Sequence, residues 1–397
     1  MKMNIAADIG NSQTKMVVGD KVDNYSIFKQ PSVIRRVMKL PVINDDSVKK
    51  IVNSLDDHLT VHISSPAIKE GMDGLYVIGK KAMTTDIDEI QNMNIKLGNK
   101  HKHDIPIIMV ISMIAQKTIQ DSFDESGELK EAYDVECDLS TAIPASEFTF
   151  KKAKSLEERF LKGFHIVVAY IGEKKVTVSI DFTRVKVMQE GMPAIFALMA
   201  ENQNILDNHN KINEKQLKLA DLKNLRLFHV DIGDGTNEYI PANGLNPILD
   251  ACSGEKRGVG HATEKALVEL NESLDGMLGN INRQKFMDIY NDKSHHLHAE
   301  AKRCLESAKI GQANLILEDV ITKISSKVGN DVDLILVYGG GSIQFRKYLE
   351  EDLNEYANQI RASVLWVPEE IAVDLNAKGL HVLNHTVFFK NKKTATK

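Results

Sequence analysis

Two stretches of the sequence place an aspartate, glycines and small polar side chains in the same order, and this combination suits phosphate binding. Within residues 5–19, two apolar runs flank a polar turn that contains Asp8, Gly10, Asn11, Ser12, Gln13, Thr14 and Lys15. Residues 227–240 repeat the pattern around Asp231, Gly233, Asp234, Gly235 and Thr236. A tight turn between two strands can point successive N–H groups outward and bind anionic oxygens. Glycine lets the backbone approach a phosphate closely. We therefore expect two β-hairpins whose turns bind phosphate.

The charged residues of these stretches suit a nucleotide with a divalent cation. Lys15 carries a mobile point charge that suits a β- or γ-phosphate. Asp8 and Asp231 each end the first strand of their hairpin, and hard carboxylate oxygens bind Mg²⁺ directly or through its retained waters. The sequence thus predicts a magnesium site beside the phosphates.

A third stretch, residues 333–345, reads as a buried strand that ends in a glycine triplet and continues into a helix. The triplet with its following serine suits close approach to a nucleoside or to a phosphate at the helix start; these residues are Gly339, Gly340, Gly341 and Ser342. A single Asp-x-Gly hairpin is explained as well by an ordinary turn. It is the ordered set of three stretches that indicates a nucleotide site.

The three stretches resemble the motifs of the ATPase superfamily of actin, heat-shock chaperones and sugar kinases. Asp8-x-Gly10 with Lys15 resembles its phosphate 1 loop, and the run from Asp231 to Thr236 resembles phosphate 2. The run from Tyr338 to Ser342 resembles the adenosine motif. Their order and wide spacing cover nearly the whole chain.

A segment between the two hairpins is similar to bacterial plasmid-segregation actins of the ParM/StbA type. Residues 187–198 read as a strand that passes through Glu190 and Gly191 into a helix. In this family the segment supplies a polar side chain that positions the attacking water. The resemblance implies this role for Glu190, with Gln189 in reserve. The alternative is a solvated carboxylate at a helix start, where the dipole favours it.

The resemblance implies an α/β fold of two actin-like (ribonuclease H-like) domains, each with an inserted subdomain, and a nucleotide in the cleft between them. The first domain would comprise residues 1–188 plus 369–397, with an insertion at about 22–66. The second would comprise residues 189–368, with an insertion at about 255–328. A helix at 370–383 would return to the first domain and break at or after Gly379.

The activity that the resemblance implies is ATP or GTP hydrolysis coupled to filament formation. Asp8, Asp231 and Glu190 would be catalytic, the two aspartates through Mg²⁺ and its waters. The partners would be further copies of the chain and a DNA-binding adaptor protein of a plasmid partition system, without sequence-specific DNA binding by the chain itself and without a membrane. A phage or other cytoskeletal role stays open. Ser12 departs from the pattern, where a glycine is usual.

Two other functions within the superfamily remain alternatives. A small-molecule kinase would need a general-base aspartate in a substrate pocket, and the sequence offers no clear candidate. A non-catalytic or chaperone-like nucleotide switch is the other, although the chain leaves no room for a downstream peptide-binding domain.

Further candidates are weaker. Glu255, Lys256 and Arg257 lie in a turn that enters a helix and could contact the ribose or base, but exposed charges are common in turns. His101 and His103 could bind a metal, yet a turn at a helix entry explains them better. The same holds for His295, His296 and His298, which lack a partnering cysteine or carboxylate pattern.

The composition of the chain limits which classes of fold and function are possible. A chain of 397 residues with 43% hydrophobic content can bury a large core and favours two or more domains. A net charge of −5 argues against a generally basic nucleic-acid binder. Three scattered cysteines fit a reducing cytoplasm, and the N-terminus lacks a signal pattern. The apolar run 105–115 is too short to span a bilayer and predicts a buried helix. The basic tail 390–397 could touch DNA, although a solvated terminus is the simpler interpretation.

Overall fold

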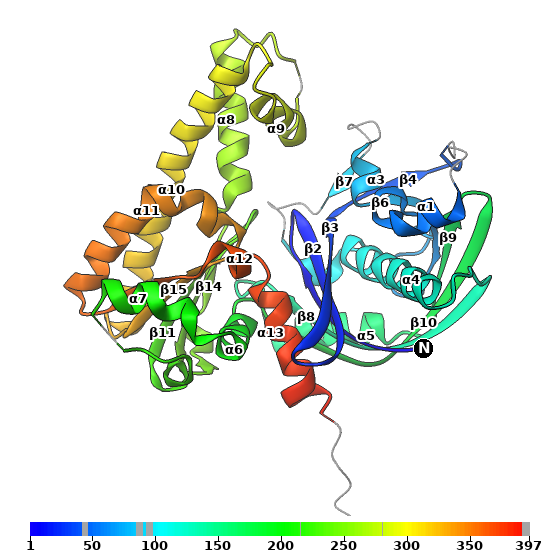
Figure 1. The fold of residues 1–397 in the computed structure, drawn as a ribbon. Coiled ribbons are helices and arrows are strands. Elements are labelled where there is room, and N and C mark those ends of the chain that lie inside the picture. The colour runs from blue at the N-terminus through cyan, green and yellow to red at the C-terminus, as the bar shows by residue number, and fades with distance from the viewer. Residues whose placement is uncertain (42–46, 85–89, 93–97, 215, 280, 391–397) are drawn as a thin grey trace, which may run out of the picture. The chain divides into compact units, whose positions relative to one another are not determined.

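A computed structural model describes residues 1–41, 47–84, 90–92, 98–214, 216–279 and 281–390. The chain forms two units (Figure 1). The first unit comprises Met1–Ile143, Glu147–Ala197 and Asn376–Lys397, and the second comprises Pro144–Ser146 and Leu198–Leu375. The predicted domain boundaries, after residues 188 and 368, fall a few residues before these limits and stay predictions. All but the first residue of the basic tail lies outside the described residues.

Within the described residues, the strands of the first unit form one sheet in the order β3-β2-β1-β8-β10-β9-β5-β6-β4-β7. Their bounds are β1 Lys2–Ile9, β2 Gln13–Lys21, β3 Asn24–Pro31, β4 Val33–Val37, β5 Thr60–Ser64, β6 Gly74–Ile78, β7 Gln91–Asn92, β8 Ala132–Ile143, β9 His165–Ile171 and β10 Lys174–Gln189. The helices are α1 Val48–Asn53, α2 Leu55–His58, α3 Lys80–Met83, α4 Ile105–Ser126, α5 Phe150–Phe160, α6 Met192–Ala200 and α13 Leu375–Leu383. The end of α6, from Leu198 on, and the first residue of α13, Leu375, belong to the second unit.

Both faces of the first unit's central strands are covered. Ile5 and Ala7 of β1 belong to the core that includes α4, whereas Ala6 packs with Leu380 of α13. Because side chains alternate along a strand, a strand covered on both faces reads as a continuous apolar run. This explains the unbroken hydrophobic stretch before Asp8.

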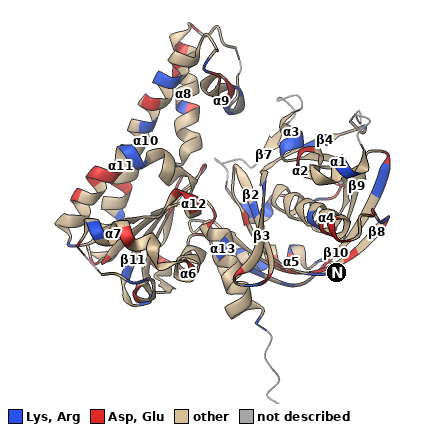
Figure 2. Cartoon of the chain, in the orientation of Figure 1, with Lys and Arg blue, Asp and Glu red and all other residues tan. Residues whose placement is uncertain are grey.

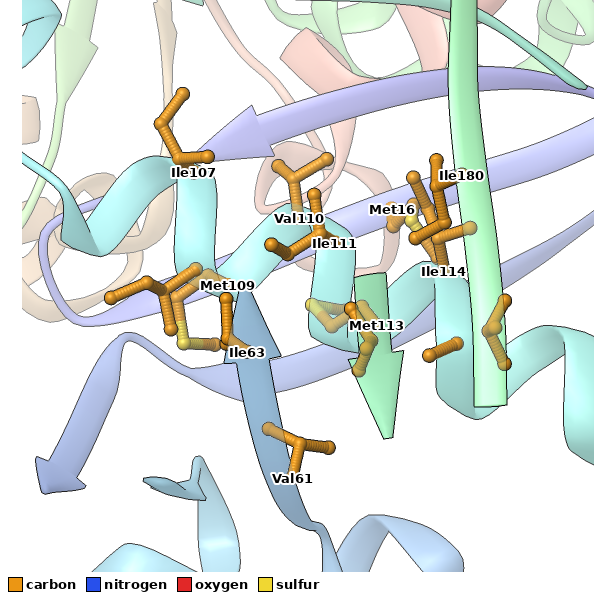
Figure 3. Packing of buried hydrophobic residues seen from close by; sticks show 14 of the residues in the cluster. Met16, Val61, Ile63, Ile107, Met109, Val110, Ile111, Met113, Ile114 and Ile180 are labelled. Atoms are coloured by element: carbon orange, nitrogen blue, oxygen red, sulfur yellow. The ribbon is translucent and has the colours of Figure 1, made fainter. Parts of the chain in front are cut away.

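The apolar run 105–115 forms the first half of α4, as the sequence predicts. Residues 106–116 of this helix are all buried, so α4 lacks a solvent face there. Figure 3 shows its side chains directed both toward Met16 and Ile180 of the central strands and toward Val61 and Ile63 of β5. The helix thus packs against both the central strands and β5 of the same sheet.

The long strand β10 has an irregularity in its pairing to β8 between Phe182 and Arg184. The prediction for residues 370–383 needs correction. They form two helices, α12 (Glu369–Ala372) and α13, which are separated before residue 375, and α13 runs through Gly379 without a break. A Cβ atom at Gly379 would lie 1.8 Å from the carbonyl oxygen of Pro193 in α6. This glycine therefore permits close helix packing and does not end the helix.

The second unit has a smaller sheet in the order β13-β12-β11-β15-β16, with β14 paired to β12. The strands are β11 Arg226–Ile232, β12 Asn237–Asn243, β13 Asn246–Pro247, β14 Ser253–Glu255, β15 Leu334–Tyr338 and β16 Ser363–Trp366. The helices are α7 Asp207–Ile212, α8 Val259–Ser273, α9 Arg283–Asn291, α10 His298–Val328, α11 Gly340–Gln359 and α12 Glu369–Ala372. β11 and β12 are antiparallel, while β15 lies parallel to β11 and to β16.

Helices α8 and α10 run side by side, and α9 packs against both (Figure 1). Their apolar positions join the strands and α11 in one core; Ala266, Phe286 and Ala308 represent the three helices in it. No helix in the described part of the chain is long and apolar enough to cross a membrane.

Candidate functional site

The first predicted hairpin is formed by β1 and β2. Asp8 lies opposite Lys15 in the register, and Ile9 lies opposite Thr14. The N–H of Gly10 donates to the carbonyl oxygen of Gln13 at 3.0 Å and closes the turn. A Cβ atom at residue 10 would lie 2.7 Å from that same oxygen, so the turn requires glycine for space. Asn11 and Ser12 form the tip, and Ser12 is exposed.

A serine that sequence reasoning missed fixes this turn. The Ser32 hydroxyl, between β3 and β4, donates to the Gly10 carbonyl oxygen at 2.6 Å and lies 2.9 Å from the Thr14 hydroxyl. The N–H of Ser32 donates to the Ser12 carbonyl oxygen at 2.9 Å. Thr14 is therefore a buried support of the turn, and its hydroxyl is already engaged by Ser32. No local signal marks Ser32 in the sequence.

The charged side chains of the first unit form two ion pairs. Lys15 Nζ lies 3.1 Å from Asp8 Oδ2, and both side chains are largely buried. Glu190, directly after β10, pairs with Lys100, a residue of the 3₁₀ turn Lys100–Lys102. Burial raises the pKa of Glu190, and Asp8 acts in the same direction, whereas Lys100 opposes the rise. The structure thus brings Asp8, Lys15 and Glu190 into one electrostatic group and adds Lys100.

Backbone contacts fix the position of Glu190. Its N–H donates to the Ile143 carbonyl oxygen at 2.8 Å. Gly191 follows with a φ of +83°, which favours glycine, and its N–H donates to Asn376 Oδ1 at 3.1 Å. The reserve candidate, Gln189, is buried, and its Nε2 finds no hydrogen-bond partner among the described residues.

The second predicted hairpin, β11 and β12, has the same turn geometry. The N–H of Gly233 donates to the Thr236 carbonyl oxygen at 2.9 Å. A Cβ atom at residue 233 would lie 2.8 Å from that oxygen. Here the residue opposite Asp231 is Glu238, a buried carboxylate that accepts from the Ser146 N–H at 3.0 Å.

The first turn of α8 holds the second hairpin. The N–H groups of Val259 and Gly260 donate to the carbonyl oxygens of Gly233 and Asp234 at 3.1 and 2.8 Å. A Cβ atom at Gly258 would lie 2.3 Å from the Asp234 carbonyl oxygen, so the helix start requires glycine there. The donors that a helix start leaves free are therefore used within the protein.

Two side chains also reach this second turn from the helical segment. Arg283, at the start of α9, donates to the Asp234 carboxylate at 3.2 Å. His261 Nε2 lies 3.0 Å from the Gly235 carbonyl oxygen, and burial lowers the pKa of His261. Sequence reasoning missed both residues, because nothing near them in the sequence points to Asp234 or Gly235.

The glycine triplet packs against the end of β11. Gly339 has a φ of +88°, and a Cβ atom there would lie 2.5 Å from Asp231 Oδ1. A Cβ atom at Gly341 would lie 2.5 Å from Ile232 Cγ2, whereas one at Gly340 would meet nothing within 4 Å. Ser342 closes the turn through its hydroxyl, which donates to the Gly339 carbonyl oxygen at 2.7 Å. The structure therefore brings the third motif to the aspartate of the second, and leaves open space at Gly340.

The weaker candidates have partners within the second unit. Glu255 Oε1 accepts from Lys323 of α10 at 2.7 Å. Arg257 pairs with Asp319 of the same helix at 3.5 Å and donates to the Leu315 carbonyl oxygen at 3.3 Å. Lys256 between them is exposed. A contact of Glu255 or Arg257 with a nucleotide stays a prediction.

The histidine clusters lie where the sequence suggests. His101 and His103 are in the turn that enters α4, and His103 Nε2 lies 2.8 Å from the Gly98 carbonyl oxygen. His295 and His296 stack on each other before α10, which begins at His298. Among the described residues, no three His, Cys, Asp or Glu side chains form a group that could hold a metal.

The residues of both units fit a nucleotide and Mg²⁺ chemically. Each hairpin turn has a glycine that brings the backbone close, and the next-to-last residue of each first strand is an aspartate with the hard oxygens that Mg²⁺ prefers. Lys15 supplies the cation for phosphate, and the buried Gln189 amide lacks a partner that a water or ligand could provide.

Comparison with known proteins agrees with this geometry. Residues 6–192 match the family described as the N-terminal domain of actin-like proteins. The solved structure of the actin-like protein Alp7A is similar with a TM-score of 0.68 at 15% identity, covering 96% of each chain. A non-polymerisable quadruple mutant of pCBH ParM gives 0.61 at 16% identity, covering 96% of this chain and 98% of the other. ParM of Bacillus thuringiensis with ATP gives 0.57 at 13% identity, with the same coverage. A sequence search of curated proteins found no match.

Proposed function

We propose that this chain binds and hydrolyses a nucleoside triphosphate and assembles into filaments with further copies of itself, because residues 6–192 match the N-terminal domain of actin-like proteins and the whole chain has an actin-like fold. The observation that carries this proposal is the pair of glycine turns, each preceded by an aspartate, together with Lys15 and Glu190 beside the first turn.

Phosphate binding would use the backbone of both turns. In the first, the candidates are Gly10, Asn11, Ser12 and Gln13, with the Lys15 ammonium as the cation. In the second, they are Gly233, Asp234, Gly235 and Thr236. The open space at Gly340 would accept the nucleoside beside the glycine triplet, with Glu255 and Arg257 as further candidate contacts.

Asp8 and Asp231 would hold Mg²⁺, directly or through its waters. The ion supplies charge neutralisation for the phosphates when it is bound. In this structure the Lys15 ammonium is paired with Asp8. With Mg²⁺ bound to Asp8, the ammonium would also be available to phosphate oxygens.

Glu190 would orient the attacking water. An ionised carboxylate accepts hydrogen bonds from a water and can take up its proton, which contributes to hydrolysis. The backbone that carries this carboxylate is fixed by two hydrogen bonds, which the N–H groups of Glu190 and Gly191 donate. Gln189 remains the reserve for this role.

The similar solved structures support assembly into a filament. They include ParM of Bacillus thuringiensis with ATP, with AMPPNP and with ADP, and a quadruple mutant of pCBH ParM described as non-polymerisable. A head-to-tail interface that does not close produces a filament. We propose that ATP or GTP binding favours assembly of this chain and that hydrolysis reverses it.

We further propose a role in plasmid DNA segregation in the cytoplasm. The chain has a net charge of −5, and Figure 2 shows basic and acidic residues interspersed along α8, α10 and α11. DNA would therefore be reached through a DNA-binding adaptor protein, without sequence-specific contacts of the chain itself. A DNA mobility-shift assay with the purified chain should show no preference for any sequence.

Light scattering tests the proposal. The wild-type protein is mixed with Mg-ATP, Mg-GTP or a non-hydrolysable analogue, beside Glu190→Ala and the control Glu158→Ala, which changes an exposed carboxylate of α5. We expect nucleotide-dependent scattering that decays in the wild type and the control but persists in Glu190→Ala. No assembly at any accessible concentration, with phosphate transferred to a small metabolite, would contradict the filament and favour the small-molecule kinase.

A further inference from the structure

Lys100 is a buried cation that contacts the proposed water-positioning carboxylate. Its ammonium donates to Glu190 Oε1, and the two side chains are only 8% and 14% exposed. The residues are 90 positions apart in the sequence. Glu190 accepts no further side-chain hydrogen bond from the described residues. One carboxylate oxygen is therefore held by Lys100, and the other is left for a water.

The turn that carries Lys100 is itself fixed. Both Asn99 and Lys100 donate their backbone N–H groups to the Glu147 carboxylate, at 2.8 and 3.0 Å. Asn99 adopts left-handed backbone geometry with a φ of +61°, a conformation that asparagine tolerates. Lys100 thus differs from a flexible surface lysine, because two hydrogen bonds to Glu147 anchor the backbone of its turn.

Lys100 favours the ionised form of Glu190. Burial raises the pKa of Glu190, and the carboxylates of Asp8 and Glu147 act in the same direction, whereas Lys100 opposes the rise. A protonated carboxyl group cannot take a proton from the attacking water. Lys15, the other ammonium of this group, is paired with Asp8.

We propose that Lys100 is a positioning residue for nucleotide hydrolysis: it holds one oxygen of the Glu190 carboxylate and so orients the other toward the attacking water. This inference rests on the proposed function, because it assigns to Lys100 a role that acts through Glu190. A buried ion pair is weak evidence for a role in stability, since apolar replacements are often neutral. Its position against Glu190 is what indicates a role in the reaction.

The test compares Lys100→Met, Lys100→Arg and Glu190→Ala with a matched control. Lys117→Met is suited, because Lys117 forms a similar partly buried pair with Asp121 within α4. Steady-state hydrolysis gives kcat, and a fluorescent nucleotide analogue gives the Kd for binding. We expect kcat of Lys100→Met to fall at least about 10-fold, with the Kd nearly unchanged; removal of a general base itself costs about 100- to 10,000-fold. Lys100→Arg should recover most of kcat, and Lys117→Met should keep it.

A second readout uses the nucleotide-free protein. Lys100→Met leaves a buried carboxylate without its cation, which lowers the Tm. Adding Glu190→Gln removes that charge, so the double variant should unfold at a higher temperature than Lys100→Met alone. Equal Tm values for the single and double variants would contradict the pairing of these two side chains.

The outcomes separate the two proposals. If Glu190→Ala abolishes hydrolysis but Lys100→Met keeps the wild-type kcat, the role of Lys100 is overturned and the proposed function stands. If Lys100→Met lowers kcat/KM only through a weaker Kd, with kcat unchanged at saturating nucleotide, Lys100 acts in binding and its positioning role is wrong. If the wild type neither binds nor hydrolyses a nucleotide, the proposed function fails and the role of Lys100 fails with it.

Discussion

The two hairpins have one backbone design and opposite electrostatics. Gly10 and Gly233 close their turns with hydrogen bonds of 3.0 and 2.9 Å to equivalent carbonyl oxygens. Opposite Asp8 lies Lys15, whereas opposite Asp231 lies Glu238. The first hairpin therefore carries its own cation, and the second faces its aspartate with another carboxylate. The same turn backbone is thus accompanied by an ammonium that suits phosphate in one unit and by a second carboxylate, which suits a cation, in the other.

The hairpins also differ in what holds them. The first turn depends on the hydroxyl of Ser32, and the second on the N–H groups at the start of α8 and on Arg283. A side-chain support can be removed by one substitution without moving the backbone. The backbone N–H groups at the start of α8 cannot be removed in this way, so their support is disturbed only by a change that pushes the helix away from the turn. The following predictions use this difference, from the largest expected effect to the smallest.

Gly258→Ala should destabilise the second hairpin most. Its Cβ atom would lie 2.3 Å from the Asp234 carbonyl oxygen and 2.5 Å from that of Gly233, and these backbone atoms cannot rotate away. We expect the free energy of unfolding to fall by about 3 kcal/mol, the upper range for overpacking. Urea unfolding measures this, and an unchanged midpoint would show that α8 does not pack on the turn as described.

Acid should destabilise β11, the first strand of the second hairpin. Burial lowers the pKa of His229 in β11 to about 4, whereas the unfolded chain has the ordinary value of 6.5. As the pH falls below 6.5 the unfolded state takes up the proton first, so stability decreases down to about pH 4 and then levels off. At pH 5 the loss should be about 2 kcal/mol.

Urea unfolding of the wild type and His229→Gln at pH 7, 6 and 5 checks this expectation. The variant should lose less stability on acidification, because it has no imidazole to protonate at that position. Parallel pH profiles for the two proteins would assign the acid sensitivity to other groups.

Ser32→Ala should weaken the first hairpin. The substitution leaves the Gly10 carbonyl oxygen and the buried Thr14 hydroxyl without this partner. An unsatisfied buried group costs about 1–3 kcal/mol. Thermal unfolding gives the loss, and Ser155→Ala on the exposed face of α5 is the control. A loss equal to that of the control would mean that the turn holds without Ser32.

Gly340→Ala should be nearly neutral for folding. A Cβ atom there meets nothing within 4 Å, whereas at Gly341 it would lie 2.5 Å from Ile232 Cγ2. Gly340→Ala should change the free energy of unfolding by less than about 0.5 kcal/mol, and Gly341→Ala should cost about 1–3 kcal/mol. If Gly340→Ala nonetheless weakens nucleotide binding, the open space at residue 340 serves the ligand. Equal stability of the two variants would contradict the packing of the triplet.

The sequence predicts the parts of this molecule that are local. The hairpins, the strand before the glycine triplet and the buried helix after Ile105 follow from apolar runs and turn residues. The actin-like fold is implied by the resemblance of the three motifs to the actin superfamily, and the solved structures confirm it. The roles of Glu190 and of the two aspartates stay predictions.

The supports of the site could not be predicted, because they join distant positions. Ser32 meets Gly10 across 22 residues, Arg283 meets Asp234 across 49, and Lys100 meets Glu190 across 90. Lysine, arginine and serine are common, so no local pattern distinguishes these three from solvated neighbours. The predicted helix break at Gly379 is wrong for a related reason: the residue that requires glycine there, Pro193, lies on another helix.

Calorimetric titration of ATP, with and without Mg²⁺, tests the contrast between the hairpins most directly. Lys15→Ala should weaken binding about 10- to 100-fold under both conditions, since a charged hydrogen bond contributes about 1.5–3 kcal/mol. Asp231→Asn should weaken binding only when Mg²⁺ is present, because its role is to hold the cation. Equal losses for Asp231→Asn in both conditions would contradict the role of Asp231 in holding the cation.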